Sequence, residues 1–94
     1  MLEKVRLALR NPPEELNEEI TDLIEAARND LIRSGVSPEK ANDDDDPLIR
    51  KAIVTYCKAY FGLDDKETVP VKEMYIKSYE KIKQELSLTG DYNV

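Results

Sequence analysis

Apolar residues recur at intervals of three and four along three long stretches of the chain, which is the spacing of amphipathic α-helices. The first stretch ends at Gly35, the second lies between Asp46 and Gly62, and the third follows Pro70. The apolar positions are Leu16, Ile20, Leu23, Ile24, Ala27 and Leu31 in the first, Ile49, Ala52, Ile53, Tyr56 and Tyr60 in the second, and Val71, Met74, Tyr75, Ile82 and Leu86 in the third. Because the second stretch is the most apolar, we expect it to be the most buried helix, with contacts on more than one face.

Prolines and capping residues indicate where these helices begin. Asn11-Pro12 and Asp46-Pro47 each place a good N-cap residue before a proline, which suits the first helical turn. Together with Pro70, these signals predict helices over residues 12–34, 47–61 and 70–87. Ser37-Pro38 has the same pattern and predicts a single helical turn in the segment between the first two helices.

A shorter apolar pattern opens the chain and predicts a helix over residues 2–10. Leu2, Val5 and Leu9 fall on one stripe of this helix. A helix of this length is marginal on its own, so it needs packing to persist. We expect these three residues to pack on the core or on a neighbouring subunit, and we assign them as a candidate subunit interface.

The chain contains no strand pattern of useful length, since its one β-branched stretch lies inside a helical period. The sequence therefore predicts an all-α fold, a small bundle of three main helices plus a short N-terminal helix. We expect residues 1–87 to form a single helical domain and residues 88–94 a flexible C-terminal tail. This tail carries the apolar residues Leu88, Tyr92 and Val94, so we expect it either to fray or to dock on a partner.

The composition excludes several kinds of chemistry. The chain contains no His and one Cys, Cys57, which excludes an intrachain disulfide, a zinc site of Cys and His, and a triad with a His base. Because Cys57 lies among apolar residues in mid-helix, we interpret it as a buried core residue. No phosphate-binding or nucleophile motif is present, so we expect neither enzymatic activity nor a cofactor. With no apolar run long enough to span a membrane and no signal peptide, we expect a soluble, intracellular protein.

The charge is negative and unevenly distributed. The net charge is −6, and residues 1–47 hold 13 acidic and 6 basic side chains against 7 and 8 in residues 48–94. This balance argues against a protein that binds nucleic acid by neutralising phosphates. The run Asp43, Asp44, Asp45 and Asp46 lacks the alternate spacing and the glycine of a calcium-binding loop, so no metal site is expected there. We interpret the run as a solvated acidic loop that also caps the following helix.

Three blocks of sequence, taken together, point to a known family. A short first helix ends in Leu-Arg, and the pattern P-x-x-E-L-N-x-x-I-x-x-L-I-E-A-A-R-x-x-L runs from Pro12 to Leu31. The third block, D-P-L-I-R-K-A-I-V-T-Y-C-K-A-Y-F-G, begins at Asp46. Over residues 1–62 the chain resembles the small head–tail connector (adaptor) family of tailed bacteriophages and their prophages. The last helix fits this family more loosely.

The resemblance implies a structural protein that assembles with copies of itself into a ring of roughly a dozen subunits. The ring would dock under the portal protein, extend the DNA channel and present a surface to a tail-completion or stopper protein. DNA would pass without specific binding, and no membrane would be involved. The resemblance places the protein in the virion at the head–tail interface, and in the host cytoplasm during assembly. Within this picture we expect Leu88, Tyr92 and Val94 to become ordered on the portal, and Asp43–Asp46 to face the channel.

An acidic helical protein also suits a second class, a small regulatory module of phage or prophage origin that mimics DNA or binds a host factor. Such a module would be a monomer or dimer with one tight protein partner and no portal. A DNA-binding helix-turn-helix is disfavoured by the net charge of −6. The segment between the first two main helices is also far longer than the tight turn of that motif.

Overall fold

A computed structural model describes the backbone of residues 1–61 and 69–93, and the side chains of these residues except 69 and 70. The elements are α1 (Leu2–Ala8), η1 (Glu14–Leu16), α2 (Asn17–Arg33), α3 (Pro38–Ala41), α4 (Pro47–Tyr60), α5 (Val69–Leu88) and η3 (Gly90–Tyr92), where η marks a short 3-10 turn. The described residues contain no strand, only an isolated bridge between Val36 and Asn93. These elements confirm the predicted all-α bundle of three main helices plus a short N-terminal helix.

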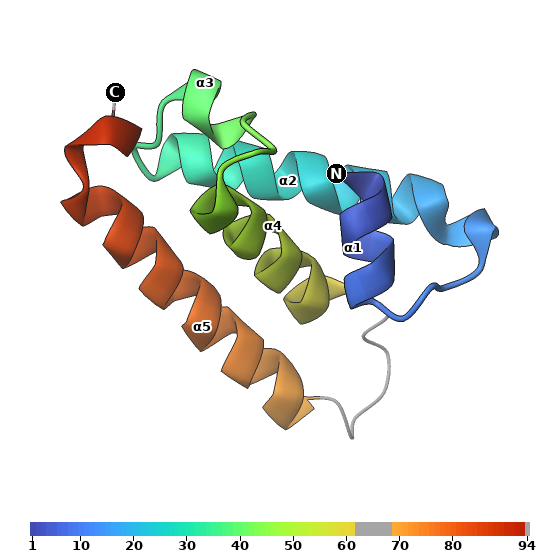
Figure 1. Cartoon of the computed structure of the whole chain (residues 1–94). Helices are drawn as coiled ribbons and strands as arrows, with labels where there is room; N and C mark the ends of the chain where they lie inside the picture. The colour runs from blue at the N-terminus through green and yellow to red at the C-terminus, as the bar shows by residue number, and fades with distance from the viewer. Residues whose placement is uncertain (62–68, 94) are drawn as a thin grey trace.

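The central helix of the bundle is α4, which lies between α2 and α5, while α1 packs on α2 and α4 (Figure 1). The buried hydrophobic residues of the three main helices are Ile20, Ile24, Ala27 and Leu31 on α2, Ile49, Ala52, Ile53, Cys57 and Ala59 on α4, and Tyr79, Ile82 and Leu86 on α5. Thr55 of α4 is buried with them. The prediction that the second main helix is the most buried, with contacts on more than one face, is confirmed.

Local capping chemistry determines where α4 begins. Asp46 Oδ1 accepts hydrogen bonds from the backbone N–H groups of Leu48 and Ile49, at 2.9 and 3.2 Å, and a proline occupies the first helical position. This satisfies two of the N–H groups that have no partner inside the helix. Ser37 caps the single turn of α3 in the same way. The predicted starts of both helices are confirmed.

The predicted N-cap at Asn11 is wrong. Arg10 and Asn11 have left-handed φ angles of 66° and 52°, and Pro13 is extended, with φ −53° and ψ 144°. A residue that precedes a proline is disfavoured in the α conformation, so Pro12, which precedes Pro13, is a poor first helical residue. The chain therefore turns through η1 first, and α2 begins only at Asn17.

A buried arginine of α2 holds the segment between α2 and α4 in place. The Arg28 residue is 8% exposed, and its Nη1 donates a hydrogen bond to the Ala41 carbonyl oxygen at 3.1 Å. The same nitrogen lies 2.8 Å from Asp44 Oδ1, in an ion pair without the alignment of a hydrogen bond. Glu25 lies 4.0 Å from Arg28 Nε on the exposed side. Through these contacts Arg28 fixes both α3 and the acidic loop to α2.

Candidate functional site

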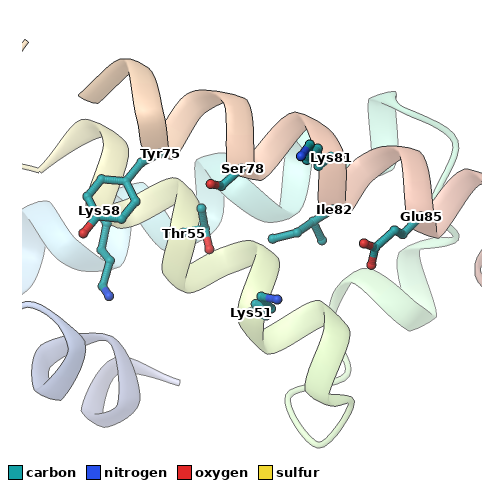
Figure 2. A pocket seen from close by; sticks show the side chains of 8 residues that line it. All are labelled: Lys51, Thr55, Lys58, Tyr75, Ser78, Lys81, Ile82 and Glu85. Atoms are coloured by element: carbon teal, nitrogen blue, oxygen red, sulfur yellow. The ribbon is translucent and has the colours of Figure 1, made fainter. Parts of the chain in front are cut away.

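A groove of about 280 Å³ runs between α4 and α5 (Figure 2). We call it the α4–α5 groove, and it is lined by Lys51, Thr55 and Lys58 of α4 and by Tyr75, Ser78, Lys81, Ile82 and Glu85 of α5. The three α4 positions are spaced by four and three, so they lie on one face of that helix. The α5 positions follow a similar spacing. The groove is therefore formed where one face of each helix meets the other.

The α4–α5 groove is electropositive. Three lysines line it against one carboxylate, that of Glu85. Among the described residues, no carboxylate lies within 4.0 Å of Lys51, Lys58 or Lys81. Lys58 Nζ lies 5.6 Å from the centre of the Tyr75 ring, a cation–π distance, and Figure 2 shows the two side chains together. Because α4 itself carries no acidic residue, nothing on that helix neutralises these cations.

A lysine on another face of α5 is neutralised, in a cluster around Asp30 of α2. Tyr79 Oη and Lys83 Nζ donate hydrogen bonds to Asp30 Oδ2 at 2.6 and 3.1 Å. Burial alone would raise the pKa of Asp30, but the hydrogen bonds from Tyr79 and Lys83 outweigh it and keep that pKa below its usual value. Burial and the same hydrogen bond raise the pKa of the Tyr79 hydroxyl. The cluster fastens α5 to α2 and neutralises Lys83, whereas the groove lysines have no such partner among the described residues.

Acid is expected to weaken the fold through Asp30. Because the pKa of Asp30 is lower in the folded chain, its stabilising contribution is complete above the ordinary value of 3.8 and is lost as the pH falls through the lowered pKa. Urea unfolding at about pH 7 and about pH 3 measures this loss. An Asp30→Asn variant should be less stable at neutral pH but lose less stability on acidification. Equal acid losses in the two proteins would contradict this role for Asp30.

The outer face of α2 is acidic. Glu18, Asp22 and Glu25 recur at spacings of four and three and are exposed, and the exposed Glu14 and Glu15 of η1 extend the series toward the N-terminus. We call these five residues the α2 acidic stripe. Of these five residues, only Glu25 has a cation of the described residues within 4.0 Å, and that cation, Arg28, lies at this limit. The buried residues of α2 lie on its opposite side, so the stripe faces away from α4.

The predicted interface residues of α1 lie largely inside the chain's own fold. Val5 is 0% exposed and belongs to the core, while Leu2 and Leu9 are half-buried against it. Val5 therefore packs on the chain's own core, which is one of the two expected arrangements, and the assignment of these residues to a subunit interface stays a prediction. The exposed large apolar residue of α1 is Leu7, whose exposed fraction is 66% and which lies outside the stripe of Leu2, Val5 and Leu9.

The acidic loop is built into the fold. Asp44 pairs with the buried arginine of α2, and its Oδ2 lies 3.8 Å from the N-terminal amine. Asp46 caps α4 with one oxygen and accepts a hydrogen bond from Tyr92 Oη with the other, at 2.7 Å. Asp43 Oδ1 accepts a hydrogen bond from the Asp45 backbone N–H at 3.0 Å, and Asp45 is the one exposed member of the run. The expectation that the whole run stays solvated is therefore wrong for Asp44 and Asp46, which have partners within the chain.

The C-terminal segment contacts its own chain through Tyr92. Besides the hydrogen bond to Asp46, the Tyr92 carbonyl oxygen accepts from the Ser37 backbone N–H at 2.7 Å, and Lys40 Nζ lies 5.5 Å from the ring centre. The hydrogen bond to Asp46, together with burial, raises the pKa of Tyr92 to about 12. Tyr92 thus packs on the fold, at a position where the sequence predicted a tail without contacts of its own.

The other two tail residues differ from Tyr92. Leu88 ends α5 and is 86% exposed, which makes it the most exposed large apolar side chain among the described residues. Val94 lies outside the described residues. The domain boundary at residue 87, the flexibility of residues 88–94 and their ordering on a portal stay predictions.

The cysteine, possible metal ligands and possible membrane-spanning helices were the remaining candidate features. Cys57 is fully buried, which confirms its interpretation as a core residue, and burial raises the pKa of its thiol to about 12. In the described part of the chain, no three metal-ligating side chains gather into a possible metal site. None of the described helices is long and apolar enough to cross a membrane.

Apolar periodicity alone did not reveal the α4–α5 groove. The available signal was Lys51, Thr55 and Lys58, three polar residues at helical spacing in a helix that is mostly apolar and has no acid. That pattern marks one basic face on α4. Which α5 residues complete the groove follows only from how the two helices pack.

Comparison with known proteins places this fold in a family. A family model described as "Phage connector protein" matches residues 1–93, which takes in every described helix, both sides of the α4–α5 groove and the α2 acidic stripe. Neither the curated proteins nor the solved structures gave a significant match. The match confirms the resemblance seen over residues 1–62 and extends it through the last helix. The chain therefore belongs to the phage connector protein family and has a connector-type structural role.

Proposed function

We propose that this protein is the subunit of a ring that joins a phage head to its tail. The ring contains roughly a dozen copies and docks beneath the portal protein. It extends the DNA channel and offers its other end to a tail-completion or stopper protein. The observation that carries the proposal is the family match over residues 1–93. In the particle the protein lies at the head–tail interface, and before assembly it lies in the host cytoplasm.

The distribution of charge supports a passive channel. The chain has a net charge of −6, with the excess of acidic side chains in residues 1–47, so the subunit as a whole repels phosphates. Asp45, the exposed member of the acidic loop, has no cation within 4.0 Å among the described residues and is free to face the channel. Like charges along a channel keep DNA moving, because no counterion-releasing contact forms between phosphate and protein. DNA therefore passes through the ring without specific binding.

The exposed end of α5 supports a contact with another protein. Leu88 is 86% exposed at the C-terminal end of the helix, beside a segment that Tyr92 anchors to α3 and the acidic loop. An apolar side chain held at a fixed position on a surface is suited to burial against a partner. We assign Leu88 to the portal contact.

A phage in which this gene carries an early stop codon tests the proposed function. Heads should still fill with DNA, but they should remain without attached tails, and free tails should accumulate, as electron microscopy of the lysate would show. A plasmid copy of the wild-type gene should restore tailed particles. Normal tailed particles without the protein would contradict the proposal and favour the regulatory module that binds a host factor.

A further inference from the structure

We infer that the α4–α5 groove of one copy binds the α2 acidic stripe of the next copy. The inference rests on the proposed ring and names the surfaces that hold neighbouring subunits together. It assigns the groove a specific occupant, a second copy of this chain. The occupant is identified by its charge, its spacing and its place on the fold.

The groove presents cations that have no carboxylate within 4.0 Å among the described residues. Lys51 and Lys58 lie seven residues apart on α4, which corresponds to about 10.5 Å along the helix. Lys81 adds a third cation from α5. The Tyr75 ring and Ile82 also line the groove and give it apolar surface beside these cations. Such a surface suits an acidic helix that also brings aliphatic side-chain stems.

The stripe presents carboxylates at the same spacing. Glu18 and Glu25 also lie seven residues apart on α2, about 10.5 Å along the helix, with Asp22 between them. Two helices laid side by side can therefore bring Glu18 and Glu25 to Lys51 and Lys58 at the same time. This match in spacing adds to the match in sign, which alone would only steer the two surfaces toward each other.

The positions of the two surfaces require a head-to-tail contact. The groove lies between α4 and α5, whereas the stripe lies on the side of α2 that faces away from α4. Because one surface meets a different surface of its neighbour, each added copy leaves a groove and a stripe free for the next. Such contacts close into a ring when the rotation between neighbours permits it. In the closed ring the neighbour covers the groove lysines, so this basic surface is not open to DNA.

Charge reversal with rescue tests the contact. The groove variant is Lys51→Glu with Lys58→Glu, and the stripe variant is Glu18→Lys with Glu25→Lys. A fourfold variant carries all these changes. Lys4→Glu with Lys77→Glu is the matched control, because both lysines are exposed, lie outside the groove lining and give the same change in net charge as the groove variant. Circular dichroism checks folding, sedimentation velocity measures self-association, and co-sedimentation with the cognate portal measures docking.

The groove variant and the stripe variant should each weaken self-association at low salt by about tenfold or more, while both still bind the portal. The fourfold variant, and an equal mixture of the two reversed variants, should regain association, and the control should resemble the wild type. Folded variants that associate like the wild type, or a folded fourfold variant without rescue, would overturn the inference. A groove that binds DNA instead would make the groove variant alone lose DNA retention, with association unchanged. Failure of the wild type to bind the portal would count against the proposed function and not against the groove contact.

Discussion

Replacing Ile53 by alanine is expected to lower the free energy of unfolding by about 3 kcal/mol. Ile53 is 0% exposed on α4, the helix that lies between α2 and α5, so its side chain is part of the shared core. Removing it takes away buried apolar surface and leaves a cavity that the surrounding helices fill only partly. Small single domains are typically stable by about 5–15 kcal/mol, so this loss is a large fraction of the total.

Chemical denaturation followed by circular dichroism measures this effect. Leu7→Ala is the matched control, because Leu7 is an aliphatic residue of similar size that is 66% exposed, and its loss should cost less than about 0.5 kcal/mol. Similar losses for the two variants would show that α4 is not the centre of the core. If the core is as described, cells that make the Ile53→Ala protein should also contain less of it.

Replacing Arg28 by alanine is expected to lower the free energy of unfolding by about 2 kcal/mol. The substitution leaves the Ala41 carbonyl oxygen without its donor and Asp44 Oδ1, a buried atom, without its cation. Because Asp44 keeps 40% of its side-chain surface exposed, water recovers part of the loss, and the cost stays below that of a fully buried ion pair. The same urea titration measures the change.

Arg33→Ala provides the control for Arg28 on the same helix. The Arg33 side chain is 77% exposed and lies 3.8 Å from Asp30, so its removal should lower the free energy of unfolding by less than about 1 kcal/mol. Hydrogen exchange locates the effect, since the Arg28→Ala protein should lose protection in α3 and the acidic loop before it loses protection in α4. Uniform loss of protection across the chain would contradict the role of Arg28 as a local clamp.

The helix starts show where sequence reasoning succeeds. Asp46-Pro47 and Ser37-Pro38 fix their helix starts through atoms within three residues, so the signal is local and the prediction holds. Asn11-Pro12 has the same signal but is followed by Pro13, whose effect on the preceding residue delays the helix to Asn17. A capping residue followed by proline therefore predicts a helix start correctly unless a second proline follows and restricts the backbone of the first.

The candidate site depended more on contacts between distant residues. Tyr92 reaches Asp46 across 46 positions, and Tyr79 reaches Asp30 across 49, so neither contact is visible in a local pattern. The apolar stripe that contains Val5 would look the same in the sequence whether it packed on the chain's own core or on a neighbouring subunit. Only the packing of α1 in the structure shows that Val5 lies in the core. The family, by contrast, was recognisable from the sequence because its blocks recur in order along the chain.

The fold shows where the acidic residues behind the negative net charge lie. The excess acid of residues 1–47 divides between carboxylates that stabilise the fold, such as Asp30, Asp44 and Asp46, and the exposed α2 acidic stripe. The opposing charge lies in the α4–α5 groove. A subunit with two unlike surfaces is suited to a closed assembly, whereas a monomeric DNA mimic would need only the acidic one.

Electron cryo-microscopy of the cognate portal mixed with this protein tests the central claim most directly. If the protein is a ring-forming connector subunit, the map should show a ring of all-helical subunits on the portal axis, with the central channel continuous through both proteins. In that ring, α2 of each subunit should lie against α4 and α5 of its neighbour. A portal that carries no added density, or copies of the protein bound singly and away from the axis, would contradict the account.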